Sequence, residues 1–430
     1  MNTTRTTYAL AFGVAAMMAV GRIYDARLNV AGLDLSLLIS AAYAAVVLLG
    51  ASGVIGAVRP SGYAGLRAGP SSGGYTFPMV LIAAWAAVYV VLVPAYDAAY
   101  TDEKLVTFAL VTLPSALLVA RQRDAGLVGA LAVALACVGG AMLLMSLPSI
   151  AGALTGRMGY GRAATRLSLF GGGPIVYARW VLTAALVVAL SRAPLVVKGA
   201  VVGAALLAAV LAQSKGPVLF FGVSLGLVAL LRALAQRRVS RATLVVSGGV
   251  LFALVGPRLI TALGLGGRLL TLFSPDQLLA TTSSTARIDL LRVSLEMIRD
   301  HPLGVGLGNW ATAASRYVIS GTVLSYPHNL FVEVAAELGV ALAVGLALWV
   351  LWYGGKSVHG LAGMLRRGHP HAGLGLTALA LFLFYLLNSL VSGDLSDARL
   401  MFVALAMLGV AAADARAGAP LAPAAVTARA

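Results

Sequence analysis

The segment Ser325-Tyr-Pro-His-Asn-Leu-Phe-Val-Glu-Val-Ala-Ala-Glu-Leu-Gly339 joins a long polar stretch to an apolar run of membrane length. Upstream of it, residues 261–328 contain no apolar run that could cross a bilayer. His328 therefore stands where a membrane helix is expected to begin. Its imidazole has an ordinary pKa close to neutral pH, so it can both accept and release a proton there. An enzyme that acts at a membrane surface would keep its catalytic groups at such a boundary.

The composition excludes a soluble domain. Of the 430 residues, 60% are hydrophobic and 11% are charged, so a single core large enough to bury the apolar surface would leave no polar coat. The net charge of +16 could suggest nucleic acid, but the Arg and Lys residues lie in short loops between apolar runs and no nucleic-acid-binding module is present. Membrane topology and anionic lipid explain the charge better. The lone Cys137 excludes a disulfide framework and a Cys-based metal site.

The apolar runs predict an all-α integral membrane protein. A bilayer-spanning helix needs about 17–25 apolar residues, and on that criterion we predict about twelve transmembrane helices. The first run is taken as a helix and not as a signal peptide, because Gly21-Arg-Ile-Tyr-Asp25 is a poor cleavage site. The predicted spans are 7–21, 33–57, 76–95, 105–120, 125–147, 173–191, 194–212, 216–234, 242–260, 329–352, 372–391 and 398–414.

The distribution of Arg and Lys predicts the orientation. With the N-terminus in the cytoplasm, the positively charged loops fall inside, and the loops Asp97–Glu103 and Ser392–Asp397 fall outside. Both termini are then cytoplasmic. The chain divides into spans one to nine (1–260), a large periplasmic loop with amphipathic helices between spans nine and ten (261–328), spans ten to twelve (329–414) and a cytoplasmic tail (415–430).

Two outside segments carry more arginine than this rule allows. They are residues 148–172, with Arg157, Arg162 and Arg166, and the loop 261–328, with Arg268, Arg287, Arg292, Arg299 and Arg316. Positive charge on the outer face needs another reason, and an anionic ligand would provide one.

The outside loop is expected to be structured. Residues 286–299 space Ile288, Leu291, Leu295 and Ile298 along one face of an amphipathic helix, which should lie flat on the outer leaflet. The stretch His301–Trp310 should end that helix, because it contains one proline and three spaced glycines. The glycine spacing is faintly like a dinucleotide-binding loop, but no strand precedes it.

Several of these elements resemble the O-antigen ligase and polymerase superfamily, the WaaL-type membrane glycosyltransferases. That family has an Arg-bearing helix, then a Pro-x-x-Gly-x-Gly-x-Gly stretch, then His-Asn, an acidic residue and Glu-x-Gly. The matching positions, in the same order, are Arg287, Pro302–Gly308, His328-Asn329, Glu333 and Glu337-Leu-Gly339.

Two further segments fit the resemblance. Gln213-Ser-Lys-Gly216 is similar to the family's Ser-Arg-Gly turn, with Lys215 in place of an arginine, which keeps the charge but loses the bidentate fork. Arg166-Leu-Ser-Leu-Phe-Gly-Gly-Gly-Pro174, followed by Arg179, resembles the Gly-Pro entry of a ligase helix. An arginine at the bilayer centre costs about 2.5–3.5 kcal/mol on insertion scales, so we expect Arg179 to face a cavity.

The resemblance implies an inverting glycosyltransferase of lipopolysaccharide biosynthesis in the bacterial inner membrane. The donor would be O antigen on undecaprenyl diphosphate and the acceptor a sugar hydroxyl of lipid A-core, joined on the periplasmic side without metal, nucleotide or other cofactor. Preorganised cations would stabilise the diphosphate leaving group, and the candidates are Arg287, Lys215, Arg166 and Arg179.

His328 is the candidate general base. Pro327 predicts that the imidazole lies in a first helical turn, where the positive end of the helix dipole favours its neutral form. Glu333 and Glu337 would lie one and two turns deeper, able to orient the site or to pair with an arginine. The supporting residues are Asn329, Glu333, Glu337 and Asp394, and Asp394 could either orient the imidazole or cap a helix.

Other functions remain open. An O-antigen polymerase or a protein O-oligosaccharyltransferase would share the loop signature. A flippase or other transporter would also have about twelve spans, but no internal repeat is visible and the polar residues gather at one membrane face. The Gly-Gly-Gly-Pro174 stretch with Arg179, and a C-terminus without a large soluble extension, favour the ligase. Taken singly, His328 could be a helix cap, and the arginines could reach to lipid phosphates.

Overall fold

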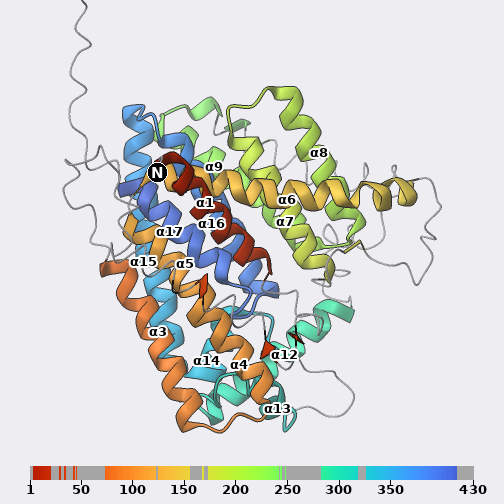
Figure 1. Cartoon of the computed structure of the whole chain (residues 1–430), viewed down its shortest axis with the longest axis vertical. Helices are drawn as coiled ribbons and strands as arrows, with labels where there is room; N and C mark the ends of the chain where they lie inside the picture. Colours follow the sequence, from red (N-terminus) through yellow and green to blue (C-terminus); the bar gives the residue numbers. More distant parts are fainter. Residues whose placement is uncertain are drawn as a thin grey trace, which may run out of the picture.

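The structure is a computed structural model that is almost entirely helical. It describes residues 3–20, 29–30, 33–34, 42–43, 45, 73–122, 124–154, 167–168, 173–241, 243–244, 247, 282–317 and 326–413. Its helices (Figure 1) are α1 (Thr3–Val20), α3 (Gly73–Leu92), α4 (Ala98–Val106), α5 (Leu113–Gln122), α6 (Ala125–Leu154), α7 (Gly173–Leu190), α8 (Leu195–Leu211), α9 (Lys215–Ala235), α12 (Thr282–Asp300), α13 (Trp310–Ala314), α14 (Leu330–Leu338), α15 (Val340–Arg367), α16 (Ala372–Ser392) and α17 (Arg399–Ala413). The predicted cytoplasmic tail 415–430 lies outside the described residues.

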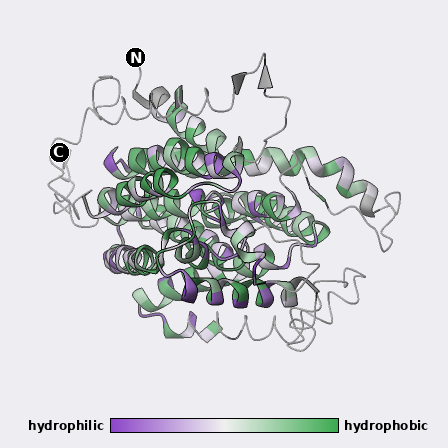
Figure 2. Cartoon of the chain, turned by 90° about the horizontal axis from the view of Figure 1, so that it is seen from below, coloured by the Kyte–Doolittle hydropathy of each residue, from purple (hydrophilic) through white to green (hydrophobic). Residues whose placement is uncertain are grey.

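Seven of the described helical segments are long and apolar enough to cross a membrane. They are Gly74–Leu92, Ala98–Arg121, Ala125–Gly152, Gly173–Leu190, Lys215–Ala235, Val340–Arg367 and Ala372–Ser392. Three shorter apolar helices, Thr7–Ala19, Leu195–Leu211 and Arg399–Ala413, coincide with further predicted spans. Hydrophobic residues run along most of the helices (Figure 2). The membrane class predicted from the apolar runs is therefore supported, with seven spans assigned in the described residues against the twelve predicted.

The two remaining predicted spans fall largely on residues that the structure does not describe. Of 242–260, only 243–244 and 247 are described. The span 33–57 was predicted to be helical from its first residue, and this is wrong at its start. Asn29–Val30 (β1) and Leu33–Asp34 (β2) form a two-residue antiparallel pair.

The predicted outside loop Asp97–Glu103 is helix for most of its length. Asp97 is the N-cap of α4, and its side chain accepts a hydrogen bond from the backbone N–H of Tyr100 at 3.1 Å. A π-helical turn, η3 (Thr107–Thr112), carries α4 into α5 without a break. The loop prediction was wrong because an Asp at an N-cap starts a helix even where the sequence that follows is polar.

The predicted span 329–352 is two helices, α14 and α15, separated at Gly339. Gly339 has φ 99°, and a side chain there would meet the Leu303 carbonyl oxygen at 2.8 Å from its Cβ. Only glycine fits both the left-handed backbone and this close approach. The nine residues of α14 therefore form a separate short helix that leads into the membrane helix α15.

The packing centre of the bundle lies around α16 and α17. α16 packs against α17, α9 and α7, while α6 packs against α1 and α7. Every residue of α17 from Arg399 to Ala412 is buried. By contrast, α3 and α15 expose large apolar side chains such as Val91, Leu92 and Leu351, the pattern expected of helices that face lipid.

Candidate active site

The turn between α16 and α17, residues Gly393–Ala398, is where the candidate side chains converge. We call it the α16–α17 turn. Helices α7 and α14 reach it or the adjoining end of α16 through hydrogen bonds, and the start of α9 lies beside that end. Two polar clusters meet here. One contains His328 and Arg179, and the other is built around a buried lysine.

His328 lies just before α14 and not on it. Asn329 is the N-cap of the helix, and its Oδ1 accepts hydrogen bonds from the backbone N–H groups of Phe331 and Val332 at 3.0 and 3.2 Å. The prediction that His328 occupies the first helical turn was wrong, because asparagine is the stronger N-cap residue. His328 instead has φ 59°, an uncommon backbone conformation for a residue with a side chain. Such strain at a polar residue is typical of functional sites.

The imidazole of His328 is held in its neutral form. Burial is the largest cause, and the positive charges of Arg287 and Arg179 add to it, while Asp397 opposes them, so that the pKa falls from 6.5 to about 4. Its Nδ1 is buried and has no hydrogen-bond partner among the described residues. The ring packs on the ring of Tyr326, with centroids 4.1 Å apart. A neutral imidazole is the form that can accept a proton.

Arg179 is buried on α7 and reaches the end of α16. Its Nη2 donates to the Ser392 carbonyl oxygen at 2.6 Å, and its Nε donates to Asn388 Oδ1 at 3.4 Å. Its Nη1 forms an ion pair with Asp397 Oδ2 at 3.4 Å. Protein partners thus accommodate the guanidinium, and the cavity that we predicted for it stays a prediction. Asp397 and Asn388 were not identified as site residues from the sequence.

Asp394 accepts hydrogen bonds within the α16–α17 turn, and its neighbour Asp397 is the acidic group that acts on the imidazole. Asp394 Oδ1 accepts a hydrogen bond from the Asp397 backbone N–H at 2.6 Å, and the Asp394 carbonyl accepts one from Ala398 at 2.9 Å. These bonds lead the chain into α17. The two predicted roles of Asp394, as a helix cap or as a residue that orients His328, both stay predictions.

Of the three other predicted cations, Lys215 and Arg287 lie in the described residues and Arg166 does not. Lys215 is the first residue of α9, and its neighbour Ser214 donates a hydrogen bond from Oγ to the Pro174 carbonyl at 3.0 Å, which ties the start of α9 to the start of α7. Gly216 lies beside Val391 near the end of α16. Arg166, together with Arg157 and Arg162, lies outside the described residues.

Arg287 lies on α12. This helix packs on the protein through a face other than the one predicted to lie on the outer leaflet. Leu290, Val293 and Met297 are buried against Trp310 and Ala336. Most of the predicted apolar face remains outward, with Ile288, Leu291 and Leu295 exposed by 50%, 39% and 55%, whereas Ile298 packs against the core. Contact of this face with the outer leaflet stays a prediction. Arg287 is half-buried, and its charge acts on His328.

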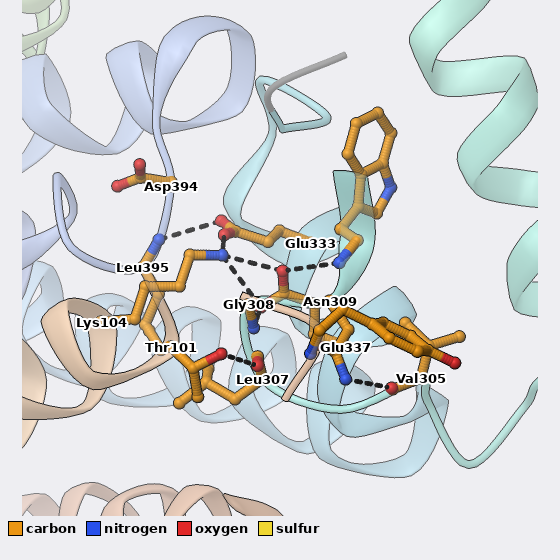
Figure 3. A network of polar contacts seen from close by, with 12 residues as sticks. Thr101, Lys104, Val305, Leu307, Gly308, Asn309, Glu333, Glu337, Asp394 and Leu395 are labelled. Carbon is orange, nitrogen blue, oxygen red and sulfur yellow. Dashed lines mark hydrogen bonds and ion pairs between the residues drawn. The ribbon is translucent and has the colours of Figure 1, made fainter. Parts of the chain in front are cut away.

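The second cluster surrounds Lys104, a buried residue of α4 (Figure 3). Lys104 was not predicted to be a site residue. Its Nζ donates to Glu333 Oε1 and to Glu337 Oε1 and Oε2, the last two at 2.8 and 2.9 Å. Nζ also lies 4.7 Å from the centroid of the Tyr100 ring. Glu333 and Glu337 were predicted to orient the site or to pair with an arginine. They pair with a lysine of α4, although the arginine-bearing helix α12 also packs against α14.

The glycine-rich loop closes around Glu337. Its Oε2 accepts a hydrogen bond from Gly308 N–H at 2.9 Å, and its Oε1 accepts one from Trp310 N–H at 3.4 Å. Gly304, Gly306 and Gly308 all have positive φ, and a side chain at Gly304 would overlap the Glu337 backbone. The loop therefore serves as a backbone cradle for a carboxylate of the same chain.

Glu333 links this cluster to the α16–α17 turn. Its Oε2 accepts a hydrogen bond from the Leu395 N–H at 3.0 Å. Burial raises the pKa of the Glu333 carboxyl above its usual range, and the Lys104 ammonium opposes part of that shift. A chain of polar contacts thus runs from Lys104 through Glu333 to the turn that carries Asp397.

Residues 200–350 match the family model described as O-antigen ligase. The match supports the O-antigen ligase and polymerase superfamily. It contains Lys215, Arg287, the glycine-rich loop, His328 and Glu333, whereas Arg179, Lys104 and the α16–α17 turn lie outside it. No curated protein matches the chain. The superfamily consists of glycosyltransferase-like membrane enzymes, which agrees with the apolar helices of this chain.

Proposed function

We propose that this protein is an O-antigen ligase. It transfers a glycan from undecaprenyl diphosphate to a sugar hydroxyl of lipid A-core at the periplasmic face of the bacterial inner membrane. The observation that carries the proposal is the setting of His328, whose imidazole has its pKa lowered to about 4 by burial and, to a smaller extent, by the charges of Arg287 and Arg179. A neutral base next to fixed cations suits a reaction that removes a proton and releases a diphosphate.

The reaction forms one glycosidic bond and breaks one. The acceptor hydroxyl oxygen attacks the anomeric carbon of the donor, and the bond from that carbon to the diphosphate oxygen breaks. The electron pair leaves with undecaprenyl diphosphate, and the hydroxyl proton goes to the unprotonated ring nitrogen of His328. Direct attack with a single base inverts the anomeric configuration. No metal or nucleotide takes part in this scheme.

The cations have separate parts in the proposal. Arg287, on the outer helix α12, and Lys215, at the start of α9, contact the diphosphate as its charge grows, and Arg166 joins them. Arg179 shares its guanidinium with Asp397 and Ser392, so it sets the local field more than it grips the ligand. Asn329 holds the start of α14 by donating a hydrogen bond from Nδ2 to the Leu390 carbonyl at 2.9 Å.

Reconstitution of the purified protein tests the proposal. Proteoliposomes would receive lipid-linked glycan and lipid A-core, with a chelator present and without nucleotide. Glycosylated lipid A-core is the expected product. Lengthened lipid-linked glycan would indicate a polymerase, a glycosylated protein acceptor an O-oligosaccharyltransferase, and leaflet exchange without transfer a flippase, and each of these results would overturn the ligase.

The variant His328→Ala tests the base. Loss of a general base typically costs about 10²–10⁴-fold in rate, so transfer should fall by that factor while the protein still inserts into the membrane. His301→Ala is the matched control, because His301 is an exposed residue of the same outer region. Wild-type transfer by His328→Ala would remove the imidazole from the mechanism.

A further inference from the structure

The cluster around Lys104 takes no part in the chemistry proposed above, although its ammonium group is buried and fully hydrogen-bonded. The three N–H bonds of its ammonium group meet three carboxylate oxygens, one of Glu333 and two of Glu337. The remaining oxygen of Glu333 accepts from Leu395, and Glu337 also accepts from Gly308 and Trp310. The lysine side chain is 1% exposed.

These bonds join four segments that are distant in the sequence. Lys104 belongs to α4, the two glutamates to α14, Gly308 and Trp310 to the glycine-rich loop and the start of α13, and Leu395 to the α16–α17 turn. Further bonds tie α4 to the same loop. Thr101 Oγ1 donates to the Leu307 carbonyl at 2.9 Å. The cluster is therefore the joint at which α14 meets its neighbours.

The two ends of this joint carry the proposed reactive groups. Glu333 stands one helical turn after the N-cap Asn329, which directly follows His328. Leu395 stands two residues before Asp397, whose charge acts on the imidazole and which pairs with Arg179. α14 is only nine residues long and is separated from α15 at Gly339, so its own length does not fix its orientation. Its glutamates do.

We propose that Lys104 is a positioning residue, which holds α14 and the α16–α17 turn in the relative placement that sets His328 beside Arg179 and Asp397. It acts through Glu333 and Glu337, and no hydrogen bond in the described residues joins Lys104 to His328. The proposal rests on the function proposed above. It adds a residue outside the stretch 200–350 that matches the family.

The energetics of buried ions favour a role in placement. A buried ion pair contributes little net stability compared with a well-packed apolar group, because desolvation offsets the attraction. A buried cluster with three carboxylate contacts is therefore a poor way to gain stability alone. Its hydrogen bonds are directional, however, and a misplacement of about 1 Å at a reacting group can cost about 10²-fold in rate.

Lys104→Met is the decisive variant. It keeps an unbranched side chain one atom shorter and removes the ammonium group. Lys356→Met is the matched control, because Lys356 is a half-buried lysine on a membrane helix that also lies over an aromatic ring, that of Trp352, 4.9 Å from the centroid. We expect kcat to fall by about 10²-fold in Lys104→Met with little change in KM, and neither to change in Lys356→Met. Lys104→Arg, which keeps the charge, should recover part of the loss.

A second readout reports on His328 directly. Diethyl pyrocarbonate modifies neutral imidazole, so the pH dependence of modification at His328, followed by mass spectrometry, gives its pKa. The other four histidines of the chain are internal references. The pKa should rise from about 4 toward 6.5 in Lys104→Met, because the displaced ring becomes more solvated. Wild-type kcat in this variant, or a lost kcat with the His328 pKa unchanged, would overturn the proposal.

Glu333→Gln decides the matter if Lys104→Met fails to accumulate in the membrane. It keeps the side-chain shape and leaves Lys104 paired with Glu337, but an amide facing both Lys104 and the Leu395 N–H must turn its NH₂ toward one donor. The same fall in kcat and rise in pKa are expected, and wild-type values of both refute the inference. A wild-type protein without transfer activity would refute the proposed function instead, and the modification profile of His328 would still test the positioning.

Discussion

The lowered pKa of His328 predicts an unusual pH dependence of activity. With a pKa of about 4, about 97% of the imidazole is neutral at pH 5.5, whereas an ordinary histidine with pKa 6.5 would be about 9% neutral there. The rate that depends on this base should therefore stay almost constant from pH 7.5 down to pH 5.5. An unperturbed imidazole would instead lose about tenfold over the same range.

The assay is kcat/KM for glycan transfer in proteoliposomes between pH 4 and pH 8, because this parameter reports the ionisation of the free enzyme. Arg287→Met removes a positive charge that disfavours the imidazolium, so it should move the acid limb to higher pH. Asp397→Asn removes a negative charge that favours the imidazolium and should move the limb lower. Burial is the largest cause, so Arg287→Met should recover only part of the way to 6.5. An acid limb near 6.5 in the wild-type protein would refute this account of His328.

The lowered pKa of His328 also predicts how the free energy of unfolding depends on pH. The folded pKa of His328 lies below the unfolded value, so the unfolded chain binds more protons between the two values. Its contribution to the free energy of unfolding is present above pH 6.5 and is lost as the pH falls from there toward 4. Thermal unfolding in detergent should show a smaller loss over this window in His328→Ala than in the wild-type protein.

Two further predictions concern the joints around the site. Gly339→Ala should lower the free energy of unfolding by about 1–3 kcal/mol, because alanine is strained at φ 99° and its Cβ meets the Leu303 carbonyl. Gly355→Ala is the control, because a Cβ there meets nothing within 4 Å. Equal melting temperatures for the two variants would contradict the reasoning. Arg179→Met should cost about 3–5 kcal/mol, since it leaves Asp397 buried without its guanidinium. Arg292→Met, which breaks an exposed pair with Glu296, should leave the melting temperature unchanged, and a loss as large as that of Arg179→Met would contradict the importance of burial.

Local patterns in the sequence predicted the parts of the fold that local physics determines. Apolar runs became helices, and α12 ended at Asp300, just before the His301-Pro302 step. The order of Arg287, the glycine-rich loop and His328 indicated the region where the site would form. Asn329 was predicted to be a supporting residue. It is in fact the N-cap of α14, and His328 therefore lies before the helix.

The remaining features depend on contacts between distant residues. The break at Gly339 exists because the Leu303 carbonyl packs there, and Lys104 finds Glu333 at a separation of 229 residues. One signal was available in the sequence. Two glutamates four residues apart on an apolar helix face the same way, so they require a cation, and Lys104 is a lysine at the edge of a predicted span. Arg179 and Asp397, 218 residues apart, offered no comparable signal.

The burial of α17 along its whole length bears on how the protein is made. This helix follows every other described helix in the chain, yet it fills the middle of the bundle. Because a chain emerges from the ribosome N-terminus first, the earlier helices lack their central packing partner until α17 is synthesised. A chain that stalls before that point lacks its central helix, and we expect membrane proteases to degrade the incomplete bundle.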